Sequence, residues 1–401
     1  MVSAASRLAA VVAVLVLTSA CQPFGGDDDP EQPDARGGSA TADRSPEGPA
    51  VSASVDDGAE QVPVDTVVTA TSDEGTIESV RLAATVEGQR VEVPGTVTDG
   101  RWQADELLEP GVRYRMKVEA VGDDGGRTSE SRSFTTQALT LAQQTYPSVA
   151  PLDGETVGVG MPVVVTFDLP VKDRAAFEQH MTVDVEGKDV PGAWHWFSDT
   201  EVHYRPKSYW PARSTVKVDL DVNAVPTGNG TFGQDSRTVT FKTGAAAVTR
   251  VDVARHRMTH YVDGRKVRTF KVTTGDDRHR TRQGTKVIME KFSTIDMDAA
   301  TTGVDSADPD YYNIKGVRWA MRLTYSGEFI HAAPWSTGSQ GRANVSHGCT
   351  GMSLADSRWL YENSRRGDVV VYTGSPRKLE PQNGWTDWNQ DWTTWQAGSA
   401  L

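Results

Sequence analysis

The sequence predicts a mainly β protein of several domains, and two observations indicate this fold class. From Val51 onward, short segments alternate apolar and polar residues, which is the pattern of a half-buried β-strand. Gly and Asp residues interrupt these segments about every ten residues, as in antiparallel sandwiches. We expect two immunoglobulin-like β-sandwich domains, a β-rich domain with one helix, and a short Trp-rich helical subdomain at the C-terminus.

Residues 1–21 have the pattern of an export signal. Arg7 precedes an apolar run, 8–17, that is shorter than the roughly 20 residues needed to span a bilayer, so cleavage is favoured. Small residues before Cys21 resemble the bacterial lipobox, in which the cysteine is acylated and becomes the mature N-terminus. We therefore predict lipidation at Cys21 and a membrane-anchored protein outside the cytoplasm. An ordinary signal peptide cleaved nearby is the alternative.

Residues 22–50 are rich in Asp, Pro, Gly and Ser, and almost no large apolar residue occurs there. Such a composition cannot bury enough surface to offset its ordering entropy, which predicts a disordered acidic linker. The formal net charge of −13 argues against nucleic acid as a partner, because nucleic-acid binding uses basic patches.

The two predicted sandwich domains cover residues 51–137 and 145–244. The first contains neither His nor Cys, so catalysis is not expected there. In the second, the aromatic residues Tyr209, Trp194, Trp196 and Trp210 are interpreted as core, and a sugar-binding platform is the alternative.

The third predicted domain covers residues 248–375. It begins as a meander with a tight turn at Asp263-Gly264. A helix is expected from a Ser353 cap to Gly367, and a buried strand follows at 368–374. In the last segment, 376–401, tryptophans at 385, 388, 392 and 395 have helical spacing, which predicts one helix clamped onto the third domain.

Only two cysteines occur among the 401 residues, and Cys349 is the sole thiol left if Cys21 carries lipid. A nucleophilic thiol needs a base and donors for the oxyanion formed when a carbonyl is attacked. His331 is the candidate base, on a strand, and fourteen residues separate it from Ser346. Gly348 would let the backbone turn closely, so that the amides of His347, Gly348 and Cys349 converge on one oxygen.

The pattern of a histidine, fourteen residues and Ser-His-Gly-Cys resembles the signature of the L,D-transpeptidases, bacterial cell-wall enzymes. The segments SGEFIHAAPW, GSQGRANVSHGC and RRGDVVVYTG, with the Trp-rich tail, are similar to lipid-anchored members that carry two immunoglobulin-like domains. The resemblance implies that residues 248–375 are the catalytic domain. It also implies a location on the outer face of the cytoplasmic membrane, peptidoglycan stem peptides as substrates, carbapenem β-lactams as covalent inhibitors and no cofactor.

The resemblance also implies residue roles. Cys349 would be the nucleophile that forms a thioester with a tetrapeptide donor and releases D-alanine, and His331 would be the base. His347 would support the loop and the oxyanion site. A neighbouring stem's amine would then complete a 3→3 cross-link. The implied substrate-binding residues are Met297, Tyr312, Ser326, Gly327, Trp335, Gly348 and Gly351, with Tyr311 as the alternative to Tyr312 on a mobile lid.

This chain departs from the family pattern in two places. Ala332 follows the base histidine where serine is common, which is tolerable if a backbone carbonyl orients the imidazole. Thr350 and Gly351 replace an aliphatic residue and a substrate-contacting Asn or Arg, which puts that contact in question.

Three alternatives stay open at this point. Water as the acceptor would give carboxypeptidase activity. A decayed site would leave a wall-binding lipoprotein. A zinc site of His331, His347 and Cys349 is disfavoured because no fourth ligand has a recognisable spacing, so no metal is expected.

Overall fold

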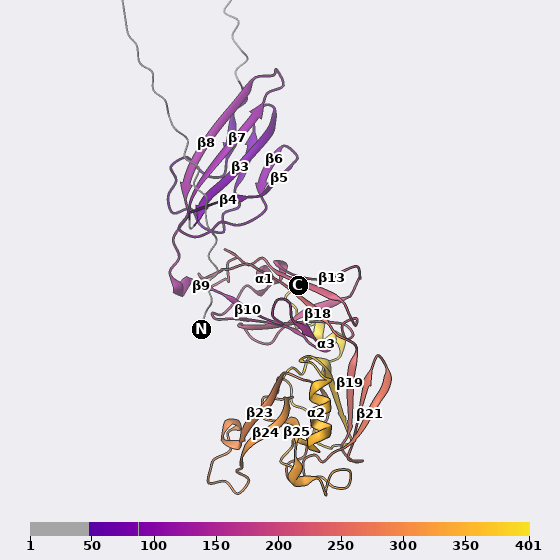
Figure 1. The fold of residues 1–401 in the computed structure, drawn as a ribbon. Helices are drawn as coiled ribbons and strands as arrows, with labels where there is room; N and C mark the ends of the chain where they lie inside the picture. The colour runs from indigo at the N-terminus through magenta and orange to yellow at the C-terminus, as the bar shows by residue number, and fades with distance from the viewer. Residues whose placement is uncertain (1–47, 87) are drawn as a thin grey trace, which may run out of the picture. The chain divides into compact units, whose positions relative to one another are not determined.

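The computed structural model describes residues 48–86 and 88–401, in which strands greatly outnumber helices (Figure 1). The mainly β fold class is confirmed. The predicted signal peptide, Cys21 and nearly all of the predicted linker lie outside the described residues. No helix in the described part of the chain is long and apolar enough to cross a membrane.

The first pair of sheets has strand orders β1-β2-β6-β5 and β4-β3-β7-β8. Residues on β7 alternate between buried and exposed, so that Tyr114 and Met116 face inward and meet Trp102 of the other sheet in one core. This is the period-two pattern on which the sandwich prediction was based. The strands are β1 Val51–Ala53, β2 Thr69–Ser72, β3 Thr76–Val86, β4 Gln89–Val93, β5 Gly95–Thr98, β6 Arg101–Ala104, β7 Arg113–Val121 and β8 Arg127–Thr135.

The second pair of sheets has strand orders β10-β12-β15-β14 and β11-β18-β16-β13, with a small β17-β9 ladder. Trp194, Trp196 and Trp210 are 2–6 % exposed within its core, which confirms the core interpretation. The elements are η1 Leu141–Gln143, β9 Gln144–Thr145, β10 Pro147–Ala150, β11 Thr156–Val157, β12 Val163–Phe167, α1 Arg174–Gln179, β13 Met181–Val185, β14 Gly192–Trp196, β15 Glu201–Pro206, β16 Thr215–Leu220, β17 Phe232–Gly233 and β18 Arg237–Thr243.

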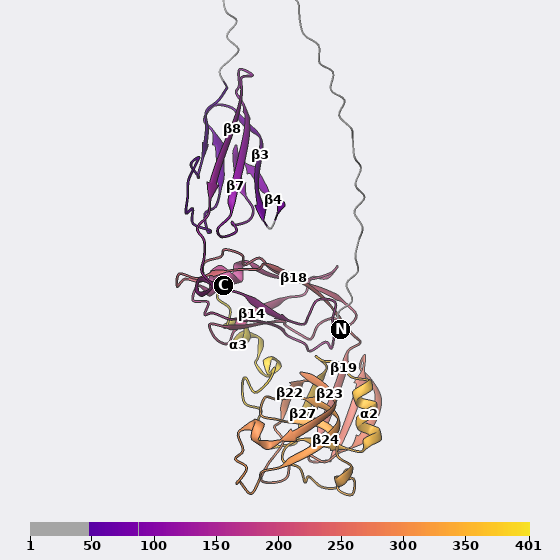
Figure 2. The same cartoon turned by 60° about the vertical axis from the view of Figure 1, so that its left-hand side comes forward.

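Two further sheets lie between residues 247 and 373, with strand orders β21-β20-β19-β27-β22 and β23-β24-β25-β26. Figure 2 shows β22 and β27 in the first of these and β23 and β24 in the second. Asp263 and Gly264 both have positive φ (50° and 76°), as the predicted tight turn requires. The elements are β19 Ala247–Asp252, β20 Arg257–Val262, β21 Arg265–Lys271, β22 Gly284–Val287, β23 Glu290–Asp298, η2 Ala299–Thr302, β24 Asn313–Arg322, β25 Phe329–Ala332, η3 Pro334–Ser336, β26 Thr350–Met352 and β27 Val369–Thr373.

Helix α2, Leu354–Glu362, begins as predicted, with the Ser353 hydroxyl accepting a hydrogen bond from the Asp356 amide at 3.1 Å. The predicted end at Gly367 is wrong, because Asn363 already caps the helix. The residues beyond it turn toward the second sandwich, where the Arg366 carbonyl accepts from the Gly158 amide at 2.7 Å. Tertiary contacts of Arg366 therefore replace the last predicted helical turn.

The C-terminal segment is not one helix. It contains η4, Asp387–Asn389, and α3, Trp392–Gln396, which starts afresh because the Asp391 side chain accepts from the Thr394 amide. Trp395 is fully buried against β14, where its indole N–H donates to the Ala193 carbonyl at 2.9 Å. The prediction that the tryptophans clamp this tail onto the third domain is wrong for Trp395, which packs on the second sandwich.

Candidate active site

Cys349 ends a loop that its neighbours hold tightly. The Ser346 hydroxyl donates to the Cys349 carbonyl at 2.7 Å and accepts from the Gly348 amide at 3.1 Å. The Thr281 hydroxyl donates to the Gly348 carbonyl at 2.7 Å. Gly348 has φ of +125°, which a residue with a side chain rarely adopts. The loop conformation therefore depends on the glycine that precedes the cysteine.

The Cys349 side chain is 8 % exposed, and its thiol donates to the Gly327 carbonyl at 3.4 Å. Burial raises the pKa of this thiol to about 12. It is therefore protonated at neutral pH and needs a base to become nucleophilic.

His331 lies on β25, which pairs in parallel with β26 so that His331 is opposite Gly351. This pairing brings the histidine and the cysteine loop together. His331 Nδ1 lies 2.8 Å from the Ala332 carbonyl oxygen, and since a carbonyl only accepts, Nδ1 carries the proton and Nε2 has the free lone pair. Burial lowers the pKa of His331, although the bond to Ala332 opposes this. A neutral imidazole with a free Nε2 is suited to accept a proton.

His331 and Cys349 face one cavity of about 360 Å³. A buried thiol, a neutral imidazole and a mainly apolar cavity form a site suited to acyl transfer. The other residues lining this cavity are Thr273, Met297, Tyr312, Ile314, Ala333, Trp335, Ser336, Ser339, Val345, Ser346, His347 and Gly351.

Comparison with known proteins agrees with this chemistry. Residues 247–371 match the model of the L,D-transpeptidase catalytic domain, and residues 59–226 match that of a bacterial Ig domain. L,D-transpeptidase 2 of Mycobacterium tuberculosis is 35 % identical over 355 residues, which cover 88 % of this chain and 85 % of the relative. The chain belongs to the L,D-transpeptidase family.

Two other relatives cover a shorter part of this transpeptidase. L,D-transpeptidase 1 of Mycobacterium tuberculosis is 33 % identical and covers 66 % of this chain and 98 % of the relative. A solved L,D-transpeptidase in complex with imipenem superimposes with a TM-score of 0.50 at 33 % identity. It covers 56 % of this chain and 97 % of that structure.

The predicted substrate-binding residues of the transpeptidase fall into two groups. Met297, Tyr312, Trp335 and Gly351 line the cavity. Tyr312, and not the alternative Tyr311, is the tyrosine that does so.

Ser326, Gly327 and Gly348 are not among the residues lining the cavity. Ser326 is instead bonded to Asn383 of the C-terminal segment, whose side-chain oxygen accepts from the Ser326 amide at 2.9 Å. Gly327 reaches the site only through the carbonyl that accepts from the Cys349 thiol.

The predicted oxyanion site needs one correction. Because the Gly348 amide donates to Ser346, it is not available to an oxyanion in this conformation. Within the described part of the chain, the amides of His347 and Cys349 donate to no acceptor, so these two are the remaining candidates. The His347 side chain is exposed at the rim and makes ring contacts with Tyr312 and His279.

A buried ion pair beneath the site was missed by the sequence analysis. The Glu328 carboxylate accepts from Lys286, and it also accepts from the Arg282 guanidinium at 3.1 Å. Lys286 also lies 3.9 Å from the centre of the Tyr372 ring. The Tyr372 hydroxyl in turn meets the Thr350 hydroxyl at 2.7 Å, so Thr350 is a polar residue with a buried partner. In the sequence, Lys286 and Glu328 look like charged residues on a protein surface, so nothing there indicates that they form a buried ion pair.

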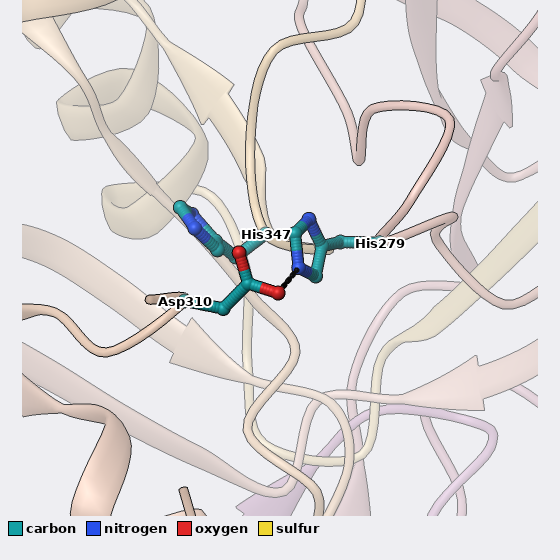
Figure 3. A group of neighbouring side chains, drawn as sticks. All are labelled: His279, Asp310 and His347. Carbon is teal, nitrogen blue, oxygen red and sulfur yellow. Dashed lines mark ion pairs between the residues drawn. The ribbon is translucent and has the colours of Figure 1, made fainter. Parts of the chain in front are cut away.

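The residues best placed to hold a metal are His279, Asp310 and His347, whose ligand atoms lie within 4.8 Å of one another (Figure 3). This set differs from the rival considered in the sequence, which combined His331, His347 and Cys349. It lies at the rim of the cavity and does not include the nucleophile.

Proposed function

We propose that this protein is a peptidoglycan L,D-transpeptidase that forms 3→3 cross-links through a Cys349 thioester. The observation that carries the proposal is the arrangement of His331 and Cys349 around one cavity, with the imidazole held by the Ala332 carbonyl so that Nε2 is the basic atom. This arrangement supports a reaction that starts from a protonated Cys349 thiol and a neutral His331 imidazole.

Acylation then proceeds as follows. His331 Nε2 takes the thiol proton as Sγ attacks the carbonyl carbon between the third stem residue and the terminal D-alanine. The amides of His347 and Cys349 stabilise the oxyanion. The carbon–nitrogen bond breaks, the D-alanine nitrogen receives the proton from His331, and a thioester remains on Cys349.

Deacylation repeats these steps with a second substrate. The side-chain amine of a neighbouring stem attacks the thioester, gives its proton to His331 and expels the Cys349 thiol, which regains the proton. Water in place of the amine gives a carboxypeptidase, the second candidate function. The half-exposed Trp335 and the exposed His347 lie at the opening where an acceptor enters.

We further propose that the chain is anchored by lipid at Cys21 on the outer face of the cytoplasmic membrane. The support is the lipobox-like sequence before Cys21, and the substrate is found in that compartment. Metabolic labelling with a fatty-acid analogue tests this anchor, and label retained in Cys21→Ala would refute it.

Incubation with imipenem, followed by intact-protein mass spectrometry, tests the thioester mechanism. A relative is known in complex with this carbapenem. We expect one drug adduct per chain, located on Cys349 by peptide mapping and absent from Cys349→Ala. An unmodified wild-type protein would contradict the mechanism and favour a decayed, wall-binding protein.

Purified tetrapeptide muropeptide distinguishes transfer from hydrolysis. We expect a cross-linked dimer with release of D-alanine. Tripeptide without dimer would instead assign carboxypeptidase activity to the same acyl-enzyme.

A further inference from the structure

Three segments far apart in the chain bring potential metal ligands together at the rim of the cavity. His279 comes from the connection between β21 and β22, Asp310 from the 299–312 segment, and His347 from the loop that carries Cys349. Figure 3 shows the Asp310 carboxylate close to both imidazole rings. The ring centres of His279 and His347 are 4.6 Å apart.

The distances are close to those of a metal site. His279 Nε2 and Asp310 Oδ2 are 3.0 Å apart. Two ligands bound at about 2.0–2.1 Å in a tetrahedral site are about 3.3 Å apart, so this pair needs almost no movement to admit an ion. All three ligand atoms lie within 4.8 Å of one another, and rotation of the exposed His347 ring can bring its nitrogen closer to the other two.

His279 is also oriented as a metal-binding histidine usually is. Its Nδ1 lies 2.9 Å from Asp276 Oδ1, which also accepts from the backbone amides of Arg278 and His279 at 2.9 and 2.8 Å. A carboxylate that holds Nδ1–H fixes the ring and leaves Nε2 to bind the metal. Here Nε2–H donates to Asp310 in the ion-free protein, and this proton is released when Nε2 binds the ion. Asp276 is then an outer-shell partner built into the loop.

The ion pairs around the cluster leave one carboxylate oxygen available to bind a cation. Asp310 uses Oδ1 for Arg278, at 3.1 Å, which leaves Oδ2 for the cluster. The neighbouring Asp277 pairs with Arg280 at 2.8 Å. Two imidazoles and one carboxylate suit zinc and similar transition metals, whereas magnesium and calcium prefer oxygen ligands alone.

We propose that His279, Asp310 and His347 bind a zinc-like divalent ion that fastens the 299–312 segment to the nucleophile loop. Asp310 precedes the cavity residue Tyr312 by two positions, and His347 precedes Cys349 by two. An ion shared between them holds the opening of the cavity in one arrangement and slows entry of an acyl donor. The binding step is independent of the proposed function, whereas the effect on acylation rests on it.

Zinc binding is tested first in full-length Cys349→Ala, with any purification tag removed, so that the reactive thiol cannot bind the metal. Calorimetric titration with zinc chloride is expected to show one ion per chain. Asp310→Asn and His279→Gln should each weaken binding by more than the 10–100-fold typical of losing an outer-shell partner, and Asp276→Asn by about that amount.

The matched controls are Asp277→Asn, which removes the same charge from the same loop, and His180→Gln, a histidine of the second sandwich. Both should bind zinc as tightly as the parent. The absence of binding in the parent, or equal binding in Asp310→Asn, would overturn the proposal.

The effect on acylation is measured with imipenem in the wild-type chain and in Asp310→Asn. Zinc should slow acylation of the wild type and have no effect on Asp310→Asn, and equal slowing in both would refute the proposed fastening. If zinc binds but imipenem never acylates, the proposed function fails while the metal site stands.

Discussion

On one side of the cavity, His331 and Cys349 are less than 10 % exposed and lie above the buried Glu328–Lys286 pair. On the other side, the 299–312 segment is mostly exposed, and Asp310 joins it to its surroundings through ion pairs with Arg278 and His279. Buried polar groups are costly to disrupt, whereas exposed ion pairs contribute little to stability. We expect the first side to determine the chemistry and the fold, and the second side to regulate access.

His331→Ala should have the largest effect on the buried side. Loss of a general base typically costs 10²–10⁴-fold in rate, about 3–5 kcal/mol of barrier, and we expect imipenem acylation to slow by that factor. Stopped-flow fluorescence measures this rate, with His180→Ala as the control. Unchanged acylation in His331→Ala would show that another group takes the thiol proton.

Glu328→Gln compared with Asp310→Asn contrasts the two sides directly. Removing the Glu328 charge leaves Lys286 buried without its partner, which typically destabilises a protein by about 3–5 kcal/mol. The Asp310 side chain is 36 % exposed, so solvent screens its ion pairs and the same change there should leave the melting temperature almost unaltered. Scanning calorimetry of the full chain compares the melting temperatures of the two variants. Equal values would mean that the Glu328 and Asp310 ion pairs contribute equally to stability.

Gly351→Asn tests the departure from the family pattern. A Cβ at Gly351 would lie 2.9 Å from the Ala333 Cβ and 3.0 Å from Thr273 Cγ2, so an added side chain forces a local shift. We expect a loss of about 1–3 kcal/mol in the free energy of unfolding, as in other overpacked sites. Gly338→Asn, where a Cβ meets nothing within 4 Å, is the control. A stable Gly351→Asn with faster turnover would show that the family contact can be restored.

The pH profile of acylation should show the smallest effect. Burial lowers the pKa of His331, so the neutral base persists below the ordinary histidine value of about 6.5. The acylation rate should therefore hold as pH falls through about 6.5 and decline only at lower pH. A midpoint above that value would mean that the imidazolium is stabilised in the free enzyme.

The residues of the catalytic pair were predictable because each stands in a local motif. The partners that hold them were not, because they come from distant segments. The parallel pairing of β25 with β26 and the Glu328–Lys286 pair are tertiary events without a local signal. The roles of the site residues stay predictions until the variants are measured.

Helix-capping and helix-spacing rules predicted correctly the helix end that depends on local hydrogen bonds. They failed for segments that contact the second sandwich. The Ser353 cap was predicted because its hydrogen bond spans only three residues. The end of α2 was not, because Arg366 pairs with Glu155 of the second sandwich at 2.9 Å. Similarly, helical spacing in the tail gave no sign that Asp391 starts a new helix.

The C-terminal tail returns to the sandwich from which the catalytic domain emerged. The Arg205 guanidinium lies 4.6–5.4 Å from the rings of Trp388, Trp392 and Trp395, and Asp387 meets the buried His203 at 2.7 Å. The catalytic domain is thus joined to this sandwich by the peptide link before β19, by the folded tail and by the contacts of Arg366 with Glu155 and Gly158. Under tension along the chain, force divides between these parallel connections, and the Arg366 contacts and the packing of the tryptophans around Arg205 must break before the peptide link is stretched alone.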